Sequence, residues 1–434
     1  MPAENGSIHY RKWLIWSLMA VAFLVVFIHR YSIAAVADDL ARELGLTGAA
    51  LSNLASMYFY AYAVMQIPSG ILADYVGPRL TAALGMLVAA AGSLLFAIAA
   101  VPAPALVGRL LVGLGVSVIF VSTLKIQAEW FRPREFATIS GLTSVVGNIG
   151  GILATTPLAL LVTFVGWRPT FLAIAAVSVA VAVAIYLVVR NRPEAAGYPA
   201  QGPRADREGI SLGTSLKMIV TNPATWPNFI ILFSAMSIIN AFSGLWGVPF
   251  LMHTYRMAKA EAAQYILYLT AGVLVGSPLV GWLSDRLGRK KPVMMAGTGM
   301  VALLWFYLLV VAGGKPPVAA LSPIFFMMGL GGISFILTFA NVKEVNHPAF
   351  SGMATSFVNS AGFIGTALLN LAVGTWLDQG WTGQIADGMR FYTLESYRST
   401  FLAFLALSVV AFAATWLVRE KAAAPKGEFA GGQE

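Results

Sequence analysis

Apolar residues form long continuous runs along almost the whole chain, and short polar segments separate them. A helix needs about 20 apolar residues to cross a bilayer, which is close to the length of these runs. Strands of a membrane barrel would alternate apolar and polar residues, and the runs do not alternate. The pattern therefore predicts an all-α membrane protein with twelve transmembrane helices. The predicted spans are residues 13–38, 50–73, 80–100, 105–128, 137–164, 168–190, 225–250, 262–283, 293–313, 318–341, 351–377 and 396–419.

The twelve predicted spans fall into two sets of six, because a long polar stretch separates the sixth from the seventh. This stretch is rich in proline and glycine and carries charges of both signs, a composition typical of a linker. The predicted organisation is an N-terminal six-helix half at 1–190, a cytoplasmic linker at 191–222, a C-terminal six-helix half at 223–420 and a cytoplasmic tail at 421–434.

The two predicted halves share an internal repeat. The segment Gly70–Gly77 (GILADYVG) recurs as Gly281–Gly288 (GWLSDRLG), an offset of 211 residues. At the same offset His29–Ser32 corresponds to Asn240–Ser243. Repeated halves are common in secondary transporters, where the substrate site lies between them near the bilayer midplane. The repeat therefore predicts two pseudo-symmetric halves with a site at their interface.

Composition excludes several classes of protein. Charged residues make up 11% of the chain and hydrophobic residues 58%, whereas about 25% of a soluble domain is charged. The chain has no cysteine, so disulfides and thiolate metal sites are excluded. The string G-x-S-x-G occurs once, at Gly209–Gly213 in the predicted linker, without the strand-turn-helix context of a nucleophile elbow. No P-loop or metal-spaced histidine set is found. We therefore expect no enzyme activity and no cofactor, and a transport cycle driven by a gradient.

The basic residues indicate the orientation in the membrane. If the N-terminus is cytoplasmic, the cytoplasmic segments hold eighteen Lys and Arg residues and the opposite segments seven. Cytoplasmic loops of membrane proteins carry such an excess. This distribution predicts a multi-pass protein of the cell (inner) membrane with both termini in the cytoplasm. Because the net charge of +9 is concentrated in loops, it does not indicate a nucleic-acid partner.

Arg30 is the residue that points most directly to a substrate. It is the only formal charge between Trp13 and Ala37. A cation at membrane depth costs on the order of 3 kcal/mol, so it normally faces the bundle interior or an aqueous cavity. Arg109 and Lys125 lie in another apolar run, and no clear carboxylate at mid-membrane depth balances these cations. The excess of positive charge favours a small organic anion, which a guanidinium holds with two parallel hydrogen bonds.

Each of these cations has an alternative role. Arg30 could be a structural cation bonded to backbone carbonyls. Lys125 could extend to the cytoplasmic interface, and Arg109 fits a structural or coupling role better than a ligand role. His29 titrates near neutrality and could carry a coupling proton, or it could be a helix-contact histidine. The predicted proton-coupling residues are His29 and Arg109. The predicted substrate-binding residues are Arg30, Tyr31, Tyr58, Tyr62, Gln66, Lys125, Tyr265, Tyr268 and Asn359.

The loop motifs resemble those of the major facilitator superfamily. Its motif G-x-x-x-D-x-x-G-x-R follows the second span, and a related motif follows the eighth. The matching residues are Gly70, Asp74, Gly77 and Arg79, then Gly281, Asp285, Gly288 and Arg289. The span-four motif R-x-x-x-G-x-G is matched by Arg109, Gly113 and Gly115. The resemblance implies the major facilitator fold and a gating role for both loop motifs; the alternative is two plain turns with solvated charges.

Two branches of the superfamily are similar to this chain. Arg30 resembles the span-one arginine that contacts the substrate phosphate in organophosphate:phosphate antiporters. The segments Tyr58–Gln66 and Gly244–Pro249 are similar to bacterial nutrient and organic-anion permeases. The resemblance implies a secondary active transporter for a carboxylate or phosphate anion, with proton-coupled uptake favoured. The alternatives are an anion exchanger and, with less support, a drug exporter or a non-transporting sensor. The expected partners are the anion, a proton or counter-anion and the lipid bilayer, with the protein as a monomer.

Overall fold

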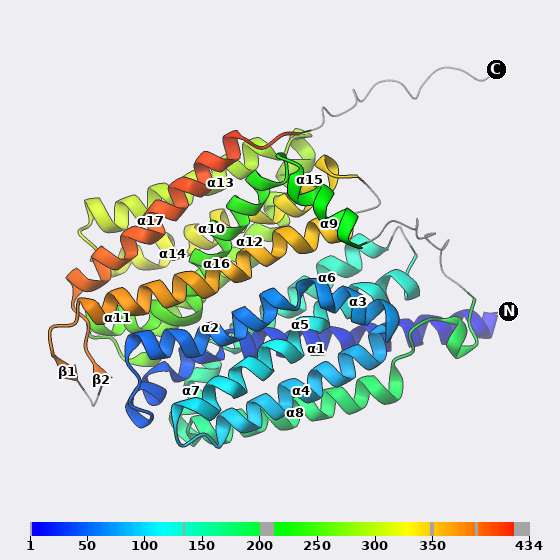
Figure 1. Cartoon of the computed structure of the whole chain (residues 1–434), viewed down its shortest axis with the longest axis horizontal. Helices are drawn as coiled ribbons and strands as arrows, with labels where there is room; N and C mark the ends of the chain where they lie inside the picture. The colour runs from blue at the N-terminus through cyan, green and yellow to red at the C-terminus, as the bar shows by residue number, and fades with distance from the viewer. Residues whose placement is uncertain (1, 133–134, 200–211, 348–350, 387–388, 421–434) are drawn as a thin grey trace.

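The computed structural model describes residues 2–132, 135–199, 212–347, 351–386 and 389–420, and these residues are almost entirely helical. Long helices form two bundles that lie side by side (Figure 1). The first bundle contains α1 (Pro2–Glu43), α2 (Gly48–Val64), α3 (Gln66–Tyr75), α4 (Pro78–Ala97), α5 (Pro102–Trp130), α6 (Phe136–Leu153), α7 (Thr156–Val165) and α8 (Trp167–Val188).

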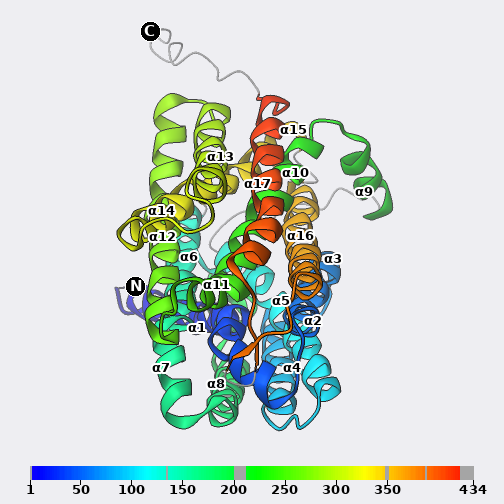
Figure 2. The ribbon, with the colours of Figure 1, turned by 90° about the vertical axis from the view of Figure 1, so that its left-hand side faces the viewer.

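A connecting segment that includes η1 (Glu194–Ala196) and α9 (Leu212–Thr221) leads to the second bundle. The second bundle contains α10 (Trp226–Ala241), η2 (Phe242–Trp246), α11 (Gly247–Tyr255), α12 (Lys259–Leu287), α13 (Lys291–Phe306), η3 (Tyr307–Val311), α14 (Val318–Gly332), η4 (Ile333–Ile336), α15 (Leu337–Val345), α16 (Ser351–Gln379) and α17 (Leu394–Trp416). A short antiparallel pair, β1 (Ile385–Ala386) and β2 (Met389–Arg390), joins α16 to α17. Figure 2 shows the bundles from the end that carries this hairpin.

Eleven helices are long and apolar enough to cross a membrane in the described residues, although twelve apolar runs were expected. The remaining run, 50–73, is helical but divided at Met65 between α2 and α3. Pro68 explains the division. Proline has no backbone N–H, and its ring clashes with the carbonyl four residues earlier, which here belongs to Val64, the last residue of α2. Pro157 and Leu153 divide α6 from α7 in the same way.

The two ends of the bundles differ. We call the end with the β1–β2 hairpin the hairpin end, and the opposite end, where α1 begins and the chain leaves α17, the termini end (Figure 1). In the predicted orientation, the termini end would face the cytoplasm.

The two bundles are joined at the hairpin end. The carboxylate of Asp378, at the end of α16, accepts hydrogen bonds from the N–H groups of Gly48 (2.9 Å) and Ala49 (2.7 Å) at the start of α2. Lys259 Nζ lies 2.9 Å from Asp39 Oδ2 across the same interface. A Cβ on Gly374 would overlap atoms of α2, so this glycine allows α16 and α2 to touch through their backbones.

Candidate functional site

Arg30 lies on α1 at the interface between the bundles, with only 8% of its surface exposed. Three aromatic rings surround the guanidinium carbon. The distances to their centroids are 4.8 Å for Phe27, 5.3 Å for Phe363 and 5.5 Å for Tyr62. Arg30 Nε also donates a long hydrogen bond of 3.4 Å to Tyr58 Oη. Because Phe363 belongs to α16, the second bundle supplies one wall of this Arg30 cage.

Arg30 takes part in none of the ion pairs found in the described residues. A buried charge is costly unless other groups compensate it. The aromatic faces attract a cation through their quadrupole, with about 2 kcal/mol or more per contact where water is excluded. They stabilise the charge without neutralising it. The cage therefore keeps a net positive charge at the interface, where an anion would be stabilised.

Arg109 is connected to the cage through Tyr58. Its guanidinium carbon lies 5.2 Å from the centroid of the Tyr58 ring, and Nη1 donates a 3.0 Å hydrogen bond to the carbonyl of His29. His29 is fully buried, with Nε2 lying 3.2 Å from Ser178 Oγ. The two predicted proton-coupling residues thus contact each other and lie next to Arg30. His29 is the residue before Arg30 on α1, and Arg109 contacts Tyr58. A change in the charge or position of either residue would therefore affect the cage directly.

Three predicted substrate-binding residues hold the two bundles together beside the cage. Tyr31 Oη donates to Asn240 Oδ1 at 3.0 Å, and Asn359 Nδ2 donates to Gln66 Oε1 at 2.9 Å. Gln66 follows Tyr62 by four residues, so the two lie one helical turn apart. Asn359 and Phe363 have the same spacing on α16. The structure therefore brings together Arg30, Tyr31, Tyr58, Tyr62, Gln66 and Asn359.

The remaining predicted ligands lie elsewhere. Lys125 Nζ donates to the carbonyl of Ala73 at 2.7 Å; this carbonyl lies in the last turn of α3, where a cation is favoured by the helix dipole. Tyr265 and Tyr268 pack against each other on α12, with their ring centroids 6.4 Å apart. Tyr268 is 40% exposed. In the described part of the chain, neither ring stacks on a ring of the Arg30 cage.

The first loop motif is fastened to its own bundle. Gly77 has a φ of +91°, a conformation that favours glycine, and it precedes α4. The N–H of Arg79 donates to Asn191 Oδ1 at 2.9 Å, and Nε donates to the carbonyl of Tyr186 at 2.8 Å. Both partners lie at or just beyond the end of α8. The side chain of Asp74 lies outside the described residues.

The second loop motif has an equivalent arrangement. Gly288, with a φ of +63°, ends α12. Glu420 accepts hydrogen bonds from the N–H groups of Lys290 and Lys291 at the start of α13, and Arg289 Nε lies 3.5 Å from its carboxylate. Lys290 follows Arg79 by 211 residues, so in both halves a side chain beyond the sixth helix caps the third. Asp285 is exposed.

Gly70 and Gly281, the first glycines of the two motifs, do not lie in close contact with another segment. A Cβ added at either position would meet no atom within 4 Å. The structure therefore provides space for a side chain at both positions. A role of these two glycines in gating stays a prediction, and it concerns the conformation in which the termini end is closed.

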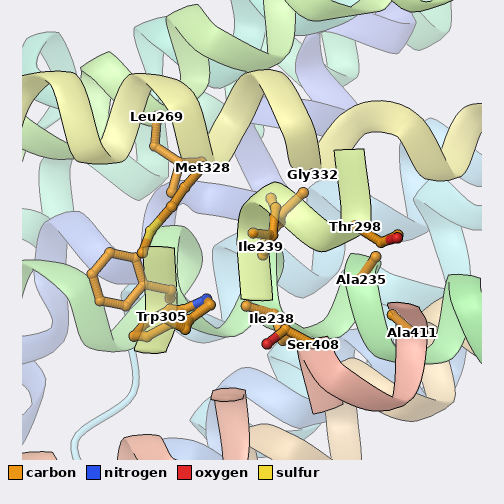
Figure 3. Close-up of a pocket in the computed structure, with 12 residues that line it drawn as sticks. Ala235, Ile238, Ile239, Leu269, Thr298, Trp305, Met328, Gly332, Ser408 and Ala411 are labelled. Carbon is orange, nitrogen blue, oxygen red and sulfur yellow. The ribbon is translucent and has the colours of Figure 1, made fainter. Parts of the chain in front are cut away.

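The cavities of the structure differ in character from the Arg30 cage. One, with about 440 Å³ of empty space, lies inside the second bundle (Figure 3) and is lined mainly by apolar side chains. Its Thr298 and Ser408 hydroxyls donate to carbonyls of their own helices, so it offers little to an anion. A second, of about 270 Å³, lies between the bundles. Its cation, Lys259, is paired with Asp39.

Sequence reasoning missed Phe27, Phe363, Asn240 and Asp378. Phe27 precedes Arg30 by three residues, so helical spacing could have placed it on the same face. Asn240 follows His29 by the repeat offset of 211 residues, which was a usable signal. Phe363 and Asp378 act across the two halves, and no local pattern identifies their partners.

The sequence matches a family model described as Major Facilitator Superfamily, over residues 18–368 and 246–433. A curated relative, the membrane sensor protein UhpC of Salmonella typhimurium, is 24% identical over 403 residues, which cover 87% of this chain and 88% of the relative. The gentisate transporter of Corynebacterium glutamicum is 28% identical over 349 residues, covering 77% and 74%.

The fold is similar to that of solved transporters. The crystal structure of a bacterial homologue of the human lysosomal transporter Spinster, in an inward-facing and unoccupied conformation, has a TM-score of 0.77 and 18% sequence identity. The similarity covers 94% of this chain and 97% of that chain. At this identity the comparison concerns the fold, and it agrees with the two-bundle arrangement.

Proposed function

This chain belongs to the Major Facilitator Superfamily, and on that premise we propose that it moves a small organic anion across the membrane by alternating access. It is a multi-pass membrane protein and not an enzyme. The proposed transport is proton-coupled uptake through the cell membrane. The protein would work as a monomer, with the anion binding at Arg30 between its two six-helix halves, 1–190 and 223–420.

The observation that carries the proposal is the position of the Arg30 guanidinium. It lies where both bundles contribute walls, and it takes part in none of the ion pairs of the described residues. Movement of α16 would take Phe363 away from the guanidinium. The same charge would then be presented to opposite sides of the membrane in turn, as alternating access requires.

The orientation follows from the excess of Lys and Arg in the predicted cytoplasmic segments. With both termini cytoplasmic, the hairpin end faces the outside. The bonds of Asp378 to α2 and of Lys259 to Asp39 would then close the outer side. The two loop motifs would lock the cytoplasmic side in the opposite state.

The relatives support an anionic substrate, because one is a gentisate transporter and gentisate carries a carboxylate. Another relative is a membrane sensor. A sensing role without transport is therefore the alternative to a transport function. Anion exchange is the alternative within transport. Exchange predicts uptake that internal substrate stimulates without a pH gradient.

Replacement of Arg30 by lysine tests the proposal. Arg30→Lys keeps the positive charge but removes the planar fork that binds a carboxylate or phosphate at two points. In proteoliposomes, we expect uptake of a transported anion to fall at least about tenfold, the effect of about 1.4 kcal/mol. Substrates are identified first by the increase in melting temperature that a bound carboxylate or phosphate causes.

Arg168→Lys is the matched control, because Arg168 pairs with Glu43 in an exposed position away from the cage. Its uptake should stay within about twofold of wild type. Near-wild-type uptake by Arg30→Lys would contradict direct recognition of the anion by Arg30. Binding of the anion without any uptake would favour the sensor alternative.

A further inference from the structure

We propose, on the basis of the transport function above, that the bound anion carries one negative charge on an apolar, planar body. We further propose that Phe363 of the second bundle selects for this body. Two features of the Arg30 cage support the inference. The cage supplies one cation, and its walls are aromatic.

The charge follows from what the three cations of the apolar spans contact. Arg109 Nη1 donates to the carbonyl of His29, and Lys125 Nζ donates to the carbonyl of Ala73 at the end of α3. Arg30 alone has its guanidinium among the rings of the cage. One guanidinium neutralises one carboxylate, and a second negative charge would be buried without a partner.

The apolar body follows from the rings around Arg30. Phe27 packs on Phe23, which stacks on Phe120 with centroids 5.3 Å apart. On the other side, Phe363 stacks on Tyr62 with centroids 4.0 Å apart and an interplanar angle of 20°. A planar ring inserted here would find aromatic surface on both sides. Offset stacking of this kind adds affinity beyond the buried area.

The polar groups beside the cage are engaged in bonds between the bundles. Tyr31 donates to Asn240, and Asn359 donates to Gln66. A polyhydroxylated body would have to break these bonds or bury hydroxyls without partners. Sites discriminate strongly when polar groups are left unpaired. The arrangement therefore disfavours sugar acids and sugar phosphates.

Phe363 has a particular place in this selection, because it comes from the second bundle and covers the guanidinium in the present conformation. A ligand ring can replace the Phe363 ring when α16 moves away. Arg30 then keeps an aromatic contact throughout the cycle while the carboxylate compensates its charge. An aliphatic polyol offers no such replacement.

The test uses the purified full-length protein in detergent and three probes: benzoate, phthalate and gluconate. Affinities come from isothermal titration, and Phe363→Leu is compared with wild type. We expect benzoate to bind at least about tenfold more tightly than phthalate or gluconate. Phe363→Leu should weaken benzoate about tenfold and change gluconate less than twofold, and Phe363→Tyr should restore benzoate binding.

Phe404→Leu is the matched control, because Phe404 is a fully buried ring in the core of the second bundle and should leave benzoate binding unchanged. The melting temperature without ligand shows whether each variant is folded. Gluconate or phthalate binding as tightly as benzoate, or no benzoate binding at all, overturns the inference. If these anions bind equally but lose affinity in Arg30→Lys, the proposed function still stands. Binding that Arg30→Lys leaves intact overturns the proposed function itself.

Discussion

Replacement of Asp378 by asparagine should open the hairpin end. The Asp378 carboxylate accepts hydrogen bonds from the N–H groups of Gly48 and Ala49, from Tyr392 Oη at 2.7 Å and from Arg390 Nη1 at 3.0 Å. It thus places a negative charge at the N-terminus of α2, which is favoured by the helix dipole. This contact joins one bundle to the other.

The expected magnitude follows from these contacts. Asparagine keeps one acceptor oxygen but presents a donor where the second oxygen accepted a backbone N–H. A hydrogen bond to a charged group contributes about 1.5–3 kcal/mol, and the helix dipole adds about 0.3–1 kcal/mol. The Asp378 side chain is 16% exposed, so solvent screens part of these electrostatic contributions. A net loss of about 2–3 kcal/mol shifts the equilibrium toward the open hairpin end by roughly 30- to 150-fold.

The assay exploits the absence of native cysteine. Ser52 is fully buried on α2, close to Gly374 of α16, so Ser52→Cys introduces a single thiol that a maleimide reaches when the hairpin end opens. We expect Asp378→Asn to raise its labelling rate at least about 30-fold. Glu395→Gln, an exposed carboxylate at the same end, should change it less than twofold.

A second reporter separates opening from unfolding. Ser408 is buried within the second bundle, so Ser408→Cys should stay unreactive in the presence of Asp378→Asn. An unchanged labelling rate at position 52 would refute the reasoning. A higher labelling rate at both positions 52 and 408 would also refute the reasoning, because the variant would then be unfolding and not only opening at the hairpin end.

Two further predictions concern the ends of the bundles. Gly374→Ala places a methyl group against α2 and should separate α2 from α16 at a cost of about 1–3 kcal/mol, seen as faster labelling of a single Ser56→Cys thiol; an unchanged rate would contradict it. Partial burial raises the pKa of Glu135, but hydrogen bonds from the Arg132 N–H and from Lys12 outweigh this and leave the pKa below its usual value. The stabilisation by Glu135, at most about 1 kcal/mol because the site is partly exposed, is therefore present above about pH 4.3 and lost as the pH falls further. The difference in melting temperature between wild type and Glu135→Gln should disappear on that acidification, and a difference that persists in acid would contradict the assignment.

The helices were predictable from the sequence because burial in lipid requires long apolar runs. The two-bundle fold followed from the 211-residue repeat, since each half carries the same loop motif. The division of the second span at Met65 was also encoded locally, in Pro68. Counting apolar residues overlooks it, because proline breaks the hydrogen-bond ladder without changing the hydropathy of the run.

The site was predictable in part. Arg30, Tyr58 and Tyr62 could be proposed because a charge and hydroxyl groups are unusual in apolar helices. Phe363 could not, because it comes to Arg30 from more than 300 residues away and is an ordinary apolar residue of α16. The partners of Lys125 were missed for a related reason. A helix pattern does not show which carbonyl a long side chain will reach.

The interruption at Met65 has a mechanical consequence. On the N-terminal side of Met65, α2 is tied to the opposite bundle through Asp378 and through Ser56 Oγ, which donates to the carbonyl of Ala367. On the C-terminal side of Met65, the last turn of α3 is tied to its own bundle through Lys125. The second span is thus two helices joined at a break, with α2 tied across the interface towards the hairpin end and the far end of α3 tied within its own bundle. When the bundles rock, bending at Met65 meets less resistance than in an unbroken helix, because Pro68 has already removed one of the helical hydrogen bonds there.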